Sequence, residues 1–120
     1  MSELMTPTAT AADVLASKIA AVASGDRAAF EHLYRATSSK LFGVCLRVIP
    51  DRDEAEDVLQ EVYATVWRKA AQFDSTRASA ITWLAMIARN KAIDRLRASP
   101  GPAKLAPIEF AEEIADPGAS

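Results

Sequence analysis

The sequence predicts an all-α protein: a compact bundle of three core helices with an N-terminal helix packed alongside. Half of its 120 residues are hydrophobic but only 7% are aromatic, and many are alanines, which favours packed helices over a sheet. Apolar residues recur three and four positions apart, the period of an amphipathic helix. We expect one domain over residues 11–97, between a flexible N-terminus at 1–10 and a linker at 98–120.

Two helices are expected in the first half of this domain. The first runs from Ala11 to Gly25, because glycine commonly ends helices. Asp26 has the residue type and position of an N-cap for the second helix, which continues to about Arg47. Pro50 stops it, since proline cannot continue a helix.

The segment from Asp51 to Lys69 predicts the most regular helix. Its acidic first turns suit the positive end of the helix dipole. Seven residues at helical spacing form one stripe that we expect to face the core: Ala55, Val58, Leu59, Val62, Tyr63, Val66 and Trp67. Four residues lie off this stripe and are expected to face outward: Asp57, Gln60, Glu61 and Ala64.

Helical periodicity is lost between Phe73 and Ala80, where small polar residues predict an ordered loop. A fourth helix is expected from about Ile81 to Arg97. Its inward side chains would be Leu84, Ile87, Ala88 and Leu96. Trp83 fits either this core or a ligand-binding surface.

Charge is strongly polarised along residues 51–97. Six acidic side chains stand against Arg52 alone between residues 51 and 61, whereas residues 68–97 carry seven basic side chains against two acidic ones. The net charge of −2 hides this asymmetry. An acidic surface followed by a basic one indicates two macromolecular partners rather than a small-molecule pocket.

No motif indicates catalysis, so we expect no enzyme, no metal ion and no cofactor. The carboxylates of Asp53, Glu56 and Asp57 favour dipole compensation at a helix start over a metal site. The single Cys45 excludes an internal disulfide and predicts a buried, inert thiol, and the lone His32 lacks a ligand partner. Without a signal pattern or an apolar run of roughly 20 residues, we expect a cytoplasmic protein with no membrane insertion.

The basic segment mixes cations with aromatic rings, a combination that binds single-stranded nucleic acid through phosphates and unstacked bases. The Asn90 amide has the donor and acceptor pattern that reads an adenine edge. A solvated helix face is the alternative interpretation of the same residues.

Two adjoining segments carry a resemblance to a known family: DRDEAEDVLQEVYATVWRK and FDSTRASAITWLAMIARNKAIDRLR. They resemble region 2, the promoter-melting domain, of extracytoplasmic-function (ECF, group 4) sigma factors of the sigma-70 family. The preceding AAFEHLYRATSSKLFGVCLRVI resembles the helix before them, so the similarity covers about residues 26–97 without a gap. It implies a domain that binds core RNA polymerase and the promoter minus-ten element to initiate transcription.

The resemblance also implies site residues. Contact with the clamp helices of the polymerase largest subunit falls on Asp57, Gln60 and Glu61. The loop from Phe73 to Ser79 would capture a base flipped from the non-template strand of the minus-ten element. With the next helix, the DNA-binding residues would be Phe73, Asp74, Ser75, Arg77, Ser79, Trp83, Arg89, Asn90 and Lys91, with Arg95 and Arg97 nearer the phosphates. An anti-sigma factor is an expected third partner.

Two departures from the family pattern matter. Many relatives have glycine where Ala78 stands, so this loop is expected to be stiffer or shaped for another base. Complete members continue into a helix-turn-helix domain, whereas residues 98–120 form a Pro-rich, acidic tail. We expect that tail to be an interdomain linker with the second domain absent, in a fragment or a natural single-domain relative. The alternative functions are a sigma mimic that sequesters an anti-sigma factor without binding DNA, and a small helical enzyme.

Overall fold

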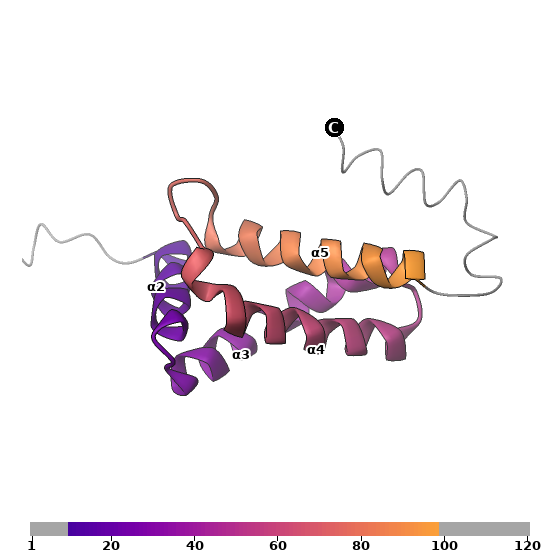
Figure 1. The fold of residues 1–120 in the computed structure, drawn as a ribbon, viewed down its shortest axis with the longest axis horizontal. Coiled ribbons are helices and arrows are strands. Elements are labelled where there is room, and N and C mark those ends of the chain that lie inside the picture. Colours follow the sequence, from indigo (N-terminus) through magenta and orange to yellow (C-terminus); the bar gives the residue numbers. More distant parts are fainter. Residues whose placement is uncertain (1–9, 99–120) are drawn as a thin grey trace, which may run out of the picture.

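The computed structural model describes residues 10–98, which form four α-helices and a short 3₁₀ helix. In chain order these are α2 (Ala11–Ala23), α3 (Arg27–Val48), α4 (Arg52–Lys69), η1 (Ala70–Gln72) and α5 (Ala80–Ala98). Helices α3, α4 and α5 pack together, and α2 lies across one end of them (Figure 1). The all-α class and the arrangement of three core helices plus an N-terminal helix are confirmed. The expectations for residues 1–9 and 99–120 lie outside the described residues.

Side-chain caps start α3 and α4, and the cap at Asp26 is the one that the sequence predicts. The Asp26 carboxylate accepts a hydrogen bond from the Ala29 N–H at 3.0 Å, and Asp51 accepts one from the Glu54 N–H at 3.1 Å. Each cap satisfies a backbone donor that has no partner within its helix. Between α2 and α3, Gly25 adopts a φ of 89°, a conformation that suits glycine.

The α4 stripe forms the centre of the core, with one exception. Six of the seven predicted residues are buried, but Trp67 is 37% exposed, so its assignment to the core was wrong. It lies near the C-terminal end of α4, where its ring packs edge-on against Phe30 of α3, with 5.2 Å between the ring centroids. Thr65 is buried in the last turns of α4 instead.

Helix α5 packs on both α3 and α4 through small side chains. Ala88 and Ala92 are fully buried together with Leu84, while Ile87 and Leu96 are only partly buried. Alanines at these positions let the helix axes approach closely. The sequence therefore predicted the inward side of α5 correctly, but Ala92 was missing from the predicted residues.

One buried polar pair links α3 to α4. The Tyr63 hydroxyl hydrogen-bonds the Thr37 hydroxyl, which donates to the Leu33 carbonyl oxygen at 2.7 Å. Burial raises the pKa of Tyr63 to about 12. Cys45 is buried as predicted, and burial raises its pKa to about 11, which keeps the thiol protonated and unreactive near neutral pH.

Candidate functional site

The outward face of α4 carries the residues expected to bind a protein partner. Asp57, Gln60 and Glu61 are all exposed, as the stripe predicts. The structure divides them between two neighbours. Asp57 and Gln60 border a groove shared with α3, whereas the Glu61 carboxylate is turned to α5.

The α3–α4 groove has a volume of about 400 Å³ and combines aromatic and charged groups. Arg52 lies over the Phe42 ring, with its guanidinium carbon 5.0 Å from the ring centroid, a cation–π distance. The Gln60 amide nitrogen lies 3.5 Å from the Tyr34 hydroxyl. The full lining is Tyr34, Ser38, Ser39, Phe42, Arg52, Glu56, Asp57, Leu59 and Gln60. Such a surface fits a partner helix that presents both apolar and basic side chains.

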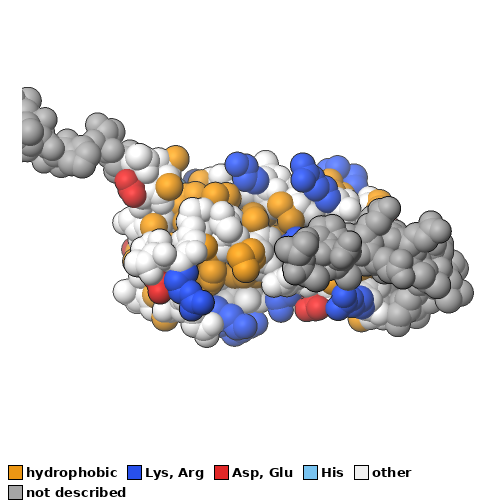
Figure 2. All heavy atoms as spheres, turned by 90° about the horizontal axis from the view of Figure 1, so that it is seen from above, with side chains coloured by type: hydrophobic (Ala, Val, Ile, Leu, Met, Phe, Trp, Pro, Cys, Tyr) orange, Lys and Arg blue, Asp and Glu red, His pale blue; other side chains and the backbone are white. Residues whose placement is uncertain are grey.

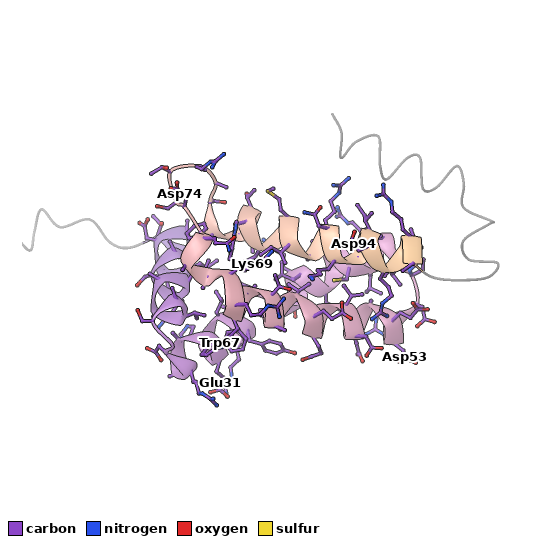
Figure 3. All side chains as sticks on the ribbon, viewed as in Figure 1. Glu31, Asp53, Trp67, Lys69, Asp74 and Asp94 are labelled. Atoms are coloured by element: carbon purple, nitrogen blue, oxygen red, sulfur yellow. The ribbon has the colours of Figure 1, made fainter. Side chains whose placement is uncertain are left out.

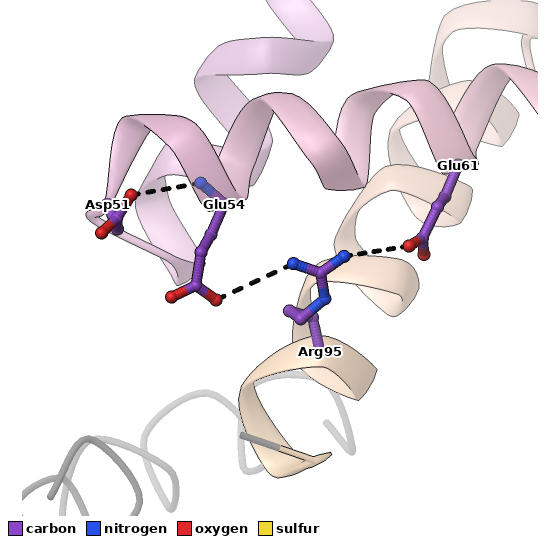
Figure 4. Close-up of polar contacts among 4 residues, drawn as sticks. All are labelled: Asp51, Glu54, Glu61 and Arg95. Atoms are coloured by element: carbon purple, nitrogen blue, oxygen red, sulfur yellow. Dashed lines mark hydrogen bonds and ion pairs between the residues drawn. The ribbon is translucent and has the colours of Figure 1, made fainter. Parts of the chain in front are cut away.

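Glu61 is already engaged within the domain. The Arg95 guanidinium of α5 donates to its carboxylate at 2.9 Å and lies 3.8 Å from the Glu54 carboxylate (Figure 4). Arg95, predicted to lie near DNA phosphates, is thus held against the acidic helix. Its side chain is only 28% exposed, compared with 52% for Glu61.

The loop before α5 is ordered by its own side chains. The Asp74 carboxylate accepts hydrogen bonds from the Thr76 N–H at 2.9 Å and the Thr76 hydroxyl at 2.6 Å, which lower its pKa. The Asp74 carbonyl oxygen accepts from the N–H groups of Arg77 and Ala78. Figure 3 shows Asp74 in the loop that projects beyond the start of α5. Its carboxylate is exposed, but both of its hydrogen bonds hold the turn. Thr76 was missed, although Asp-x-Thr is a recognisable turn pattern.

Other side chains of this loop also make contacts within the domain. Ser79 caps α5 by accepting from the Thr82 N–H at 3.2 Å, and its hydroxyl donates to the Thr82 hydroxyl at 2.9 Å. Phe73 and Trp83 are partly buried and pack on each other, with 5.3 Å between ring centroids. Ser75 and Arg77 are exposed. The loop therefore offers few unoccupied polar side chains to a ligand.

A second groove, of about 350 Å³, lies between the end of α4 and α5. It brings together three of the predicted DNA-binding residues: Trp83, Asn90 and Lys91. Six further residues that the sequence interpretation did not assign to it complete the lining: Thr65, Lys69, Gln72, Met86, Ile87 and Asp94. Met86 is 54% exposed, an unusual position for a large apolar side chain.

The face of the molecule on which α5 lies suits a polyanion with apolar bases. Figure 2 shows the molecule from the side on which α5 lies: hydrophobic side chains gather in its middle, and Lys and Arg side chains border them. Arg97 is exposed and Arg89 partly buried. Cations around an apolar patch match single-stranded nucleic acid, whose phosphates and base faces need both.

Two findings concern metal and membrane sites in residues 10–98. No group of three or more His, Cys, Asp or Glu side chains in this part of the chain is placed to hold a metal ion. None of its helices is long and apolar enough to cross a bilayer.

Comparison with known proteins agrees with this geometry. The family model of Sigma-70 region 2 matches residues 33–99, more than half of the chain. The ECF RNA polymerase sigma factor SigK of Mycobacterium bovis is 43% identical over 76 residues, which are 63% of this chain and 41% of that protein. SigK of Mycobacterium ulcerans is 37% identical over 86 residues, 72% of this chain and 46% of that protein. The chain thus spans less than half the length of these relatives. It belongs to the sigma-70 family as an ECF sigma factor, and the bundle with its two grooves is region 2 of that family.

Proposed function

We propose that this domain binds core RNA polymerase through the α3–α4 groove and the minus-ten promoter element through the α4–α5 groove. The observation that carries the proposal is the use of one helix by both grooves. Asp57 and Gln60 line the first, and Thr65 and Lys69, further along α4, line the second. A bound polymerase helix and a bound DNA strand would therefore be held in a defined mutual position.

On the polymerase side, the carboxylates of Glu56 and Asp57 complement basic residues of the clamp helices of the largest subunit. Tyr34 and Phe42 supply the apolar contact that a helix needs for stable docking. An anti-sigma factor that covers this groove would block polymerase directly. Both encounters would take place in the cytoplasm.

On the DNA side, Lys69 and Lys91 approach one groove from two helices and supply phosphate contacts. Asn90 reads a base edge, while the exposed Met86 and the flank of Trp83 provide apolar contact for an unstacked base. Capture of bases on the non-template strand offsets a few kcal/mol of unpairing, which favours the melted promoter.

A sigma mimic, which needs only the protein-binding groove, is the second candidate. Two observations favour it: Asp94 places a carboxylate in the α4–α5 groove, and Arg95 is paired with Glu61. Both reduce the positive potential available to DNA. Lys69 and Lys91 in the same groove weigh against it.

Fluorescence anisotropy with single-stranded minus-ten oligonucleotides, alone and with core polymerase, tests the proposal. We expect Asn90→Ala to relax base preference, whereas Arg97→Ala weakens binding equally for every sequence and lowers the salt dependence. Ser17→Ala, on the exposed side of α2, is the matched control and leaves both unchanged. Sequence-blind binding, or no binding in either setting, favours the mimic.

A further inference from the structure

We propose that Arg95 is shared between the two binding surfaces: Glu61 holds it in the free domain, and a DNA phosphate takes it when a basic partner side chain occupies Glu61. The inference rests on the proposed function. Glu61 directly follows Gln60 of the α3–α4 groove along α4, so a polymerase docked in that groove with a basic side chain on Glu61 would raise DNA affinity through one identifiable ion pair.

The geometry supports a competition for Glu61. Its carboxylate is 52% exposed, so a partner's cation has access to it while Arg95 is bound. The Glu54 carboxylate, 3.8 Å from the Arg95 guanidinium, is a second and weaker ion-pair partner. Figure 4 shows Arg95 reaching across from α5 to both carboxylates of α4. A second cation on Glu61 would weaken its attraction for Arg95 through direct competition and charge repulsion.

Arg95 is also placed to reach DNA once released. It follows Lys91, a lining residue of the α4–α5 groove, by four positions on the same helix. One turn of helix separates the two, about 6 Å along the axis. A strand that runs along α5 past Lys91 therefore comes within reach of the long Arg95 side chain. Asp94, the residue before Arg95, lines the groove. When the Arg95 guanidinium leaves Glu61, its positive charge therefore also offsets the negative charge of Asp94.

The size of the effect follows from the exposure of the pair. Exposed ion pairs typically change an equilibrium about 1.4- to 5-fold, so that is the expected strengthening of DNA binding on release of Arg95. One additional phosphate contact steepens the log–log salt dependence of single-strand binding by about 0.7. By linkage, DNA strengthens binding of the basic partner by the same factor.

The test uses the full 120-residue chain and fluorescein-labelled oligo(dT), because a phosphate contact does not depend on sequence. We expect Glu61→Gln to strengthen binding about 1.4- to 5-fold at low salt and to steepen the salt dependence. The same substitution in an Arg95→Gln background should have no comparable effect. Asp53→Asn removes an equal charge from the first turn of α4, whereas the carboxylates that pair with Arg95 are those of Glu54 and Glu61; it therefore controls for the general loss of repulsion.

The outcomes separate the two levels of the proposal. Strengthening by Glu61→Gln that disappears with Arg95→Gln supports the shared contact. Strengthening that persists in the Arg95→Gln background, or that Asp53→Asn equals, overturns it while DNA binding stands. Absence of oligo(dT) binding by every variant overturns the shared contact, whereas the DNA-binding function itself is overturned only if the minus-ten oligonucleotides also fail to bind in the presence of core polymerase.

Discussion

The hydroxyl of Tyr63 is expected to stabilise the domain by tying α4 to α3 behind the acidic face. In Tyr63→Phe the ring and its burial remain, and only the hydrogen bond with the Thr37 hydroxyl is lost. Thr37 still donates to the Leu33 carbonyl oxygen, so no new unpaired donor appears. We therefore expect a loss of about 1 kcal/mol in the free energy of unfolding, the usual net value of one such bond. For a domain of this size that lowers Tm by about 4–8 °C.

Urea denaturation followed by far-UV circular dichroism measures this loss, with an unchanged m-value as the sign that the unfolded state is unaffected. Tyr34→Phe is the matched control, because it makes the same change in a neighbouring ring that is only partly buried. Thr37→Val should cost more, about 1–3 kcal/mol, because it leaves the buried Tyr63 hydroxyl without its partner. The double variant should then cost less than the sum of the two single losses. Additive losses, or equal effects of Tyr63→Phe and Tyr34→Phe, would refute the reasoning.

Three further predictions concern the binding surfaces and the core. Asp57→Ala with Gln60→Ala should weaken core polymerase binding about 30-fold in a titration, since two interface hydrogen bonds of about 1 kcal/mol each are lost; unaltered affinity with an intact fold would place the interface elsewhere. Asp74→Ala should weaken single-strand binding in anisotropy, although it removes a negative charge, because the loop turn depends on that carboxylate; stronger binding would contradict this. Stability in urea should fall as pH rises between about 9 and 12, because Cys45 and Tyr63 ionise near their ordinary pKa values of 9.0 and 10.0 when unfolded but near 11 and 12 when folded; a flat profile over that range would show that the two groups are not buried.

Local patterns in the sequence were sufficient for the helices. Side-chain caps such as Asp26 and Asp51 act within three residues, and helical periodicity within one element, so both are readable without the fold. The same periodicity turned Asp57, Gln60 and Glu61 outward, as observed. The family resemblance assigned partners to those faces, which periodicity alone does not do.

Contacts between helices were decided only by the tertiary structure. A helical period tells which side of α4 is apolar, but not which neighbour borders each edge of its polar side. For that reason the outward trio was treated as one surface, although Glu61 pairs with Arg95, 34 residues away, and Gln60 lies toward α3. Trp67 was misplaced for a related reason, since its ring packs against Phe30 of α3 and stays 37% exposed, which the helical period does not reveal.

The α4–α5 groove shows the same difference between what the sequence predicts and what packing decides. Asn90 and Lys91 were identifiable from the chain as polar residues on a basic helix, whereas Lys69 and Gln72 join them only because α5 folds back along α4. The sequence by itself determined the helices, their exposed faces and their polarity of charge, because these depend on neighbours along the chain. Which charges meet across the bundle, and so which remain available to a partner, depends on packing between distant segments, and only the folded structure decides it.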